Sequence, residues 1–278
     1  MNQGKLQEAE TIYRDLIAAG MNSHVVYGNL AAICGRQGKL NELIDLLKKA
    51  LELKPNYQIA HNNLGLALKD QGDLTAAIAS FNTALELNPN DPIAHYNLGI
   101  ALKAQGDLSA AIISYNKALS LKPNYPEAHY NLGNALKDQG NLTAAIASYN
   151  KAIELNPNDP IAHNNLGAAL EQQGDITAAV ASYNTAIKLN PNDPDAHGNL
   201  AHTLLLLGDY QKGWEEYEWR STKKKNPSLP HSNPSCARFV DVKLNINNQL
   251  LLVSEQGLGD TLQFMRYALE LKRQGIAI

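Results

Sequence analysis

The stretch that decides the fold is residues 126–159, PEAHYNLGNALKDQGNLTAAIASYNKAIELNPND, in which two apolar helical patterns flank the glycine at position 140. Relatives of this stretch lie before and after it at intervals of 34 residues. A fixed period of this length is the signature of a stacked repeat architecture. The same interval separates the helix-breaking residues, which are Pro55, Pro89, Pro123, Pro157 and Pro191, and Gly4, Gly38, Gly72, Gly106, Gly140, Gly174 and Gly208.

Each period predicts two helices joined by a glycine turn. Proline suits the first helical turn, where a missing N–H costs nothing, and it stands at positions 92, 126, 160 and 194. The turn glycines can take the left-handed backbone that ends many helices. Aspartates are placed as N-caps before first helices at positions 91, 159 and 193, and before second helices at positions 73, 107, 175 and 209.

Small and aromatic residues recur where the two helices of a period approach each other. Gly65, Gly99, Gly133 and Gly167 mark the first helix, Ala77, Ala111, Ala145 and Ala179 the second, and Phe81, Tyr115, Tyr149 and Tyr183 lie beside them. Together with the proline positions, this pattern resembles the tetratricopeptide repeat (TPR) family. The resemblance implies an all-α, right-handed superhelix with a concave groove, because a single helix pair cannot bury its own apolar face.

We expect this superhelix to occupy residues 1–222, with full repeats at 24–57, 58–91, 92–125, 126–159 and 160–193. A divergent repeat begins at 194, and residues 1–23 resemble the second helix of an earlier repeat, so we interpret the N-terminus as cut or as the start of an incomplete gene product.

A row of asparagines repeats as faithfully as the apolar residues. An amide offers a donor and an acceptor, which matches the N–H and C=O groups of an extended peptide. One hypothesis is therefore a peptide-binding groove; the other is that each amide bonds a neighbouring repeat and fixes its geometry. The row, called the asparagine ladder below, consists of Asn29, Asn63, Asn97, Asn131, Asn165 and Asn199.

The ladder is similar to that of the O-linked N-acetylglucosamine transferase family, which also carries acidic residues four positions before it. Only Glu127 and Asp195 match here, while Val25, Ile59, Ile93 and Ile161 fill the other equivalent positions, so the groove is more apolar and substrate preference does not carry over. We expect the further groove residues Asp70, Asn134 and Asp138 to contribute to binding, with selectivity around residues 127–138.

A second row, His61, His95, His129, His163 and His197, invites a metal hypothesis. Packed helices lie about 8 to 10 Å apart, whereas a metal needs ligand nitrogens about 2 Å away. We therefore favour a packing role for these histidines, and we predict no metal site.

The repeat pattern stops near residue 222. Pro227, Pro230 and Pro234 interrupt any helix in the predicted linker 223–248, and residues 249–278 predict the truncated βα start of an α/β, Rossmann-like domain. The segments GWEEYEWR and EQGLGDTLQFMRY resemble bacterial TPR proteins with a glycosyltransferase-like domain related to heptosyltransferases. This resemblance implies that Asp260 is either a catalytic base or a plain N-cap.

The resemblance also implies a nucleotide sugar as the cofactor of a complete parent, in which the groove would recognise the substrate. This chain lacks a second Rossmann-like domain, so we expect it to be catalytically inert and to need no cofactor. The alternative is a stand-alone adaptor or assembly scaffold with no enzymatic role.

Composition excludes other partners. The net charge is −3, and 18% of residues are charged, so no sequence-wide excess of cations favours nucleic acid or an anionic membrane. The two cysteines form no CxxC pair, no apolar run approaches the roughly 20 residues of a bilayer span, and the N-terminus lacks a signal-peptide core. We therefore expect a cytoplasmic protein that binds a protein or an extended peptide.

Overall fold

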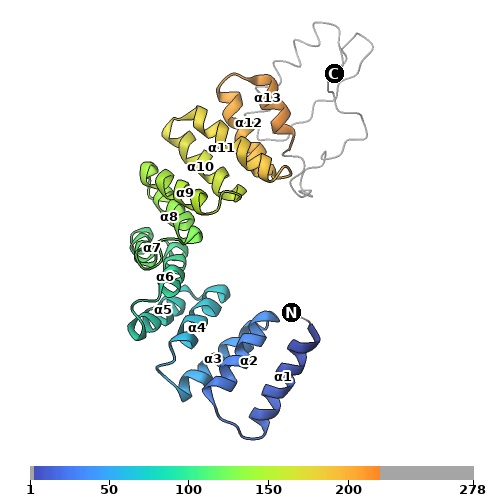
Figure 1. Cartoon of the computed structure of the whole chain (residues 1–278), viewed down its shortest axis with the longest axis vertical. Helices are drawn as coiled ribbons and strands as arrows, with labels where there is room; N and C mark the ends of the chain where they lie inside the picture. The colour runs from blue at the N-terminus through green and yellow to red at the C-terminus, as the bar shows by residue number, and fades with distance from the viewer. Residues whose placement is uncertain (1–2, 220–278) are drawn as a thin grey trace, which may run out of the picture.

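The computed structural model describes residues 3–219, and within this range the chain forms thirteen α-helices and no strand (Figure 1). The first helices of the repeats are α2 (His24–Arg36), α4 (Gln58–Gln71), α6 (Pro92–Gln105), α8 (Pro126–Asp138), α10 (Pro160–Gln173) and α12 (Pro194–Leu206). The second helices are α1 (Gln3–Ala18), α3 (Leu40–Leu53), α5 (Leu74–Leu87), α7 (Leu108–Leu121), α9 (Leu142–Leu155), α11 (Ile176–Leu189) and α13 (Tyr210–Tyr217).

The helix ends confirm the predicted N-caps, first-turn prolines and turn glycines. Asp91 caps α6 by accepting hydrogen bonds from the N–H groups of Ile93 and Ala94, and the prolines begin α6, α8, α10 and α12. The turn glycines from Gly38 to Gly208 have left-handed backbones, with φ between 72° and 95°. Gly4 differs from them, because it lies inside α1 instead of in a turn.

Within a repeat, the glycine of the first helix receives an aromatic ring from the second. A Cβ on Gly99 would lie 2.6 Å from Cε1 of Tyr115, a ring that is completely buried. The last repeat reverses this arrangement: Ala201 replaces the first-helix glycine, and Gly213 of α13 makes room for Leu205. The buried core is distributed along the array in three clusters instead of gathering at one centre.

The stacking produces a curved array, in which each helix lies beside its neighbours in the chain (Figure 1). First helices also contact the next first helices, in the pairs α4–α6, α6–α8, α8–α10 and α10–α12. Within the described part of the chain, no second helices make comparable contacts with one another. The first helices therefore lie on the inside of the curve and line its concave face.

The predictions for residues 223–278, including the linker, the Rossmann-like βα unit and Asp260, lie outside the described residues. The architecture that the structure shows is an all-helical solenoid.

Candidate functional site

The asparagine ladder connects successive first helices. Four of the six amide nitrogens donate to the residue just before the ladder asparagine of the preceding repeat. The acceptors are the Asn62 Oδ1 for Asn97 (3.1 Å), the Tyr96 hydroxyl for Asn131 (2.9 Å), the Tyr130 hydroxyl for Asn165 (2.7 Å) and the Asn164 Oδ1 for Asn199 (3.0 Å). The first-helix contacts and these bonds support the inter-repeat role that the sequence left open.

These bonds engage the amide nitrogen of each asparagine. An amide has two N–H groups and an acceptor oxygen, so the Oδ1 atom and one amide hydrogen of Asn97, Asn131 and Asn199 are not used by these bonds. Asn165 donates a second bond to Asn134, so only its Oδ1 is left. A structural role therefore leaves hydrogen-bonding capacity toward a ligand on the half-buried Asn131, Asn165 and Asn199, whereas Asn97 is only 6% exposed.

Two members of the ladder depart from this scheme. Asn29 donates to the Tyr13 hydroxyl of α1 at 3.0 Å, because no first helix precedes α2 in the described residues. Asn63 has no inter-repeat bond, since the position that would supply the acceptor is Gly28, which has no side chain. Asn63 therefore separates the two hypotheses for the ladder.

The other predicted groove residues fall into two groups. Asp70 and Asp138 form ion pairs with Lys69 (3.0 Å) and Lys103 (2.9 Å). The Asn134 Oδ1 accepts hydrogen bonds from the Tyr149 hydroxyl at 2.7 Å and the Asn165 amide at 3.1 Å. Like Asp70 and Asp138, Glu127 and Asp195 are exposed; they lie at the start of α8 and α12.

The histidine row has a different role in the structure. Nε2 of each ring lies 2.8 to 3.1 Å from the carbonyl oxygen of the proline six residues earlier, and so joins the first helix to the preceding loop. His197 also bonds the Glu216 carboxylate through Nδ1 and stacks on the Trp219 ring. Among residues 3–219, no group of three or more His, Cys, Asp or Glu side chains is arranged to hold a metal.

An exposed aliphatic row starts the first helices, four positions before the ladder. Its members, called the aliphatic row below, are Val25, Ile59, Ile93 and Ile161, and they are 47%, 56%, 51% and 57% exposed. Glu127 and Asp195 interrupt this row at the equivalent positions of α8 and α12. The concave helices therefore carry apolar contacts at regular intervals, broken by two carboxylates.

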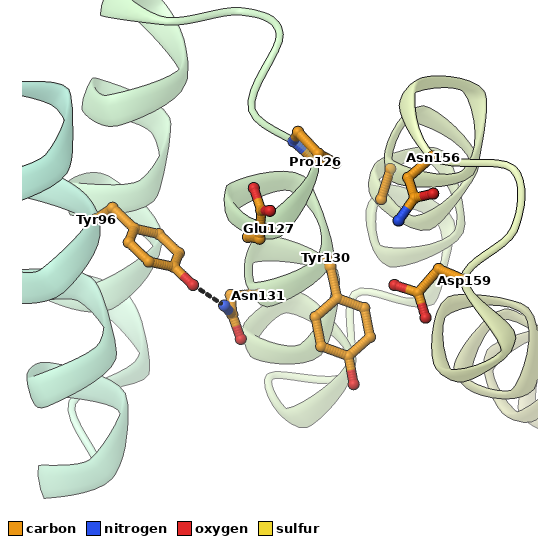
Figure 2. Close-up of a pocket in the computed structure, with 8 residues that line it drawn as sticks. Tyr96, Pro126, Glu127, Tyr130, Asn131, Asn156 and Asp159 are labelled. Carbon is orange, nitrogen blue, oxygen red and sulfur yellow. Dashed lines mark hydrogen bonds between the residues drawn. The ribbon is translucent and has the colours of Figure 1, made fainter. Parts of the chain in front are cut away.

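A pocket of about 280 Å³ opens where Glu127 interrupts the aliphatic row. Its polar lining comes from Tyr96 of α6, Glu127, Tyr130 and Asn131 of α8, and Asn156 and Asp159 of the loop before α10 (Figure 2). Burial raises the pKa of Tyr96, so its phenol stays protonated at neutral pH.

Sequence reasoning identified Glu127 and Asn131 but missed the tyrosines and the loop residues. A signal for the tyrosines was present, because Tyr96 and Tyr130 directly precede ladder asparagines.

These features define a helical-repeat solenoid whose first helices, in the described part of the chain, combine amides, exposed aliphatic side chains and an acidic, aromatic pocket. The TPR repeat family model matches the chain at residues 33–72, 65–106, 101–140, 133–174 and 169–208. The chain therefore belongs to the TPR repeat family.

Solved structures agree with this assignment. MamA is 27% identical with a TM-score of 0.57, over 61% of this chain and 92% of MamA. MamA 41-end from Desulfovibrio magneticus RS-1 is 25% identical with a TM-score of 0.58, over 61% and 96% of the two chains. YrrB, described as a TPR protein with an unusual peptide-binding site, is similar in fold, with 22% identity and a TM-score of 0.58 over 66% and 95%.

The comparison with curated proteins found no match. No helix among the described residues is long and apolar enough to cross a membrane.

Proposed function

We propose that the concave face binds an extended segment of a partner protein. The observation that carries this proposal is the coincidence of two rows on the same helices, the partly available amides of the ladder and the exposed aliphatic row. Exposed aliphatic side chains on a concave face supply apolar area that a bound segment can bury. YrrB supports only the point that this fold can carry a peptide-binding site.

The two rows have complementary functions in this proposal. Amide oxygens accept hydrogen bonds from peptide N–H groups whatever the side chains are, and each such bond contributes about 0.5 to 1.5 kcal/mol net. The aliphatic row supplies apolar burial, at roughly 25 cal/mol per Å². The peptide's ordering cost opposes both, so we expect weak to moderate affinity for a short segment.

The test starts with a displayed library of random dodecapeptides, selected on the full chain and followed by fluorescence anisotropy of the selected peptides. Ile93→Asp places a charge in the aliphatic row, and Ile113→Asp places the same charge on the outer helix α7, where Ile113 is 70% exposed. We expect Ile93→Asp to weaken binding at least about tenfold and Ile113→Asp to leave it unchanged. Equal effects of the two substitutions would refute a concave site.

The ladder has its own matched pair. Asn97→Ala removes an inter-repeat hydrogen bond, so we expect it to lower the free energy of unfolding by about 1 kcal/mol, whereas Asn63→Ala should be nearly neutral. If the ladder also contacts ligand, both substitutions weaken the selected peptides. Loss of stability without loss of binding would leave the ladder a purely structural role.

We also propose that this chain is part of a larger glycosyltransferase-like protein. This proposal rests on the resemblance of residues 213–220 and 255–267 to bacterial TPR proteins with a heptosyltransferase-related domain. In that parent the groove would present acceptors, and Asp260 would be the base that removes a proton from the acceptor hydroxyl. The assay is sugar transfer from a nucleotide sugar by the purified chain, which we expect to be absent. If the chain did transfer sugar and Asp260→Asn abolished that activity, the expectation of an inactive chain would be wrong and Asp260 would be identified as the catalytic base.

A further inference from the structure

The pocket at the start of α8 has acceptors and aromatic rings but no cation of its own. Glu127 and Asp159 contribute two carboxylates, and no lysine or arginine lies among the lining residues. Figure 2 shows the Asp159 carboxylate on the side of the pocket opposite Tyr96, with Tyr130 between them. Among the described lining residues, the two carboxylates therefore have no positively charged partner.

One carboxylate oxygen of Asp159 is left open by a local change in sequence. Oδ1 caps α10 by accepting from the N–H groups of Ile161 (3.0 Å) and Ala162 (3.3 Å). Two repeats earlier, Oδ2 of the equivalent Asp91 accepts a 2.6 Å hydrogen bond from Gln58. Pro126 stands at the position equivalent to Gln58 and has no donor to offer, so Asp159 faces the pocket without that bond.

Two of the other loops carry a cation at the corresponding place, whereas positions 88 and 190 are asparagine, as position 156 is. Lys122 lies over the Tyr125 ring with Nζ 4.1 Å from its centroid, and Lys54 lies 5.3 Å from the Tyr57 centroid. Position 156 is the equivalent of both lysines, and it is an asparagine here. A cation over a tyrosine ring is a favourable arrangement. In this loop Asn156 replaces the lysine and Asp159 replaces the tyrosine beneath it, so the pocket has a carboxylate and no resident cation where those two loops have a lysine over a ring.

We propose that this pocket takes a lysine or arginine side chain of the segment bound in the groove, an inference that rests on the proposed function. The carboxylates of Glu127 and Asp159 pair with the cation, and the Tyr96 and Tyr130 rings enclose its aliphatic stem. Charge-assisted hydrogen bonds are about twice as strong as neutral ones, so this position determines selectivity.

The repeat geometry also predicts what flanks the basic residue. Adjacent packed helices lie about 8 to 10 Å apart. A polyproline II segment advances about 3.1 Å per residue with three residues per turn, so every third side chain faces the same way after roughly 9 Å. Ile93 and Ile161 occupy the position of Glu127 in the repeats on either side. The ligand therefore has an apolar residue three positions before and three positions after the basic one.

The probe is the peptide acetyl-Leu-Pro-Ala-Arg-Pro-Ala-Leu-amide, compared with the same peptide carrying glutamine in place of arginine. On the full chain we expect the arginine peptide to bind about tenfold or more tightly than the glutamine peptide, and its advantage to shrink as NaCl is raised. Fluorescence anisotropy of labelled peptides measures both affinities.

Two substitutions remove the site without threatening the fold. Glu127→Ile restores the residue found at positions 59, 93 and 161, and Asp159→Asn keeps a capping oxygen, as Asn141 does for α9. The matched control is Asp175→Asn, which makes the same change in the N-cap of α11. We expect the preference for arginine to disappear in the double variant Glu127→Ile/Asp159→Asn and to persist in the control.

The outcomes separate this inference from the proposed function. Equal binding of the two peptides would refute the cation pocket but not the peptide-binding groove. A preference for arginine that persists in the double variant would do the same. Failure of both peptides to bind also overturns the pocket as described. In that case the displayed library tests the proposed function separately. Selected peptides whose binding depends on Ile93 would support the concave peptide-binding site, and failure to select any such peptide would refute it.

Discussion

At the scale of single residues, the four buried aromatic rings differ in how their polar atoms are satisfied. The Tyr149 hydroxyl donates to Asn134, but the Tyr115 hydroxyl is buried without a partner, because Ile100 stands where the next repeat has Asn134. Phe81 needs no partner. Burying a polar group without a hydrogen bond costs about 1 to 3 kcal/mol.

We therefore predict opposite effects for one chemical change. Tyr115→Phe removes the unsatisfied hydroxyl, so it should leave the free energy of unfolding unchanged or raise it by about 1 kcal/mol. Tyr149→Phe removes a hydrogen bond and should lower that free energy by about 1 kcal/mol. Urea denaturation followed by circular dichroism measures both, and a larger loss for Tyr115→Phe would contradict the assignment.

Glycine substitutions test the close approach of the helices. In Gly99→Ala the new Cβ would lie 2.6 Å from the buried Tyr115 ring, so overpacking of about 1 to 3 kcal/mol should exceed the helix-propensity gain of about 1 kcal/mol. Gly198 lies in α12 with nothing within 4 Å of its added Cβ, so Gly198→Ala should stabilise by about 0.5 to 1 kcal/mol. The melting temperatures should therefore shift in opposite directions.

Residue patterns alone predicted the caps, the left-handed turn glycines and the glycine-to-ring contacts. These depend on neighbours within one repeat, whose spacing in the sequence is fixed. The partners of the ladder amides were not predictable in this way. Asn97 bonds a residue 35 positions earlier, and only the relative placement of two first helices brings these side chains together.

At the scale of elements, α1 is held to the rest of the array by a cluster around Glu10. Glu10 is 9% exposed, and its carboxylate accepts hydrogen bonds from Lys39 (2.9 Å), Gln37 (2.6 Å) and Arg14 (2.8 Å). These donors, Lys39 foremost, lower the pKa of Glu10 to about 2. The contact ties α1 to the turn between α2 and α3.

The lowered pKa makes the attachment of α1 sensitive to acid. Because the folded pKa of Glu10 lies below its ordinary value of 4.5, its stabilisation is present above about pH 4.5 and is lost as pH falls toward 2. Hydrogen exchange should show the α1 amides losing protection over this range before those of α6 to α9. In the Glu10→Gln variant, the α1 amides should be less protected at pH 7, and their protection should depend much less on pH. An unchanged dependence of α1 protection on pH would contradict the role of Glu10.

At the scale of the whole molecule, the curvature follows from contacts between successive first helices. That curvature places the ladder and the aliphatic row on one concave face, while Ile113 lies on an outer helix. The period of 34 residues predicted the solenoid, which the structure confirms, whereas the peptide-binding groove that the resemblance implies stays a prediction. The pocket was not predictable, because it requires Tyr96, Glu127 and Asp159 from three different segments to meet.

The central claim is that the concave face binds an extended peptide, and side-chain amide resonances test it directly. In a ¹⁵N-labelled chain, we predict that a selected peptide shifts the NH₂ signals of Asn63, Asn97, Asn131 and Asn165. The exposed asparagines of outer helices, Asn116 and Asn150, should stay unchanged. Shifts at Asn116 and Asn150 with unchanged ladder signals would contradict the claim.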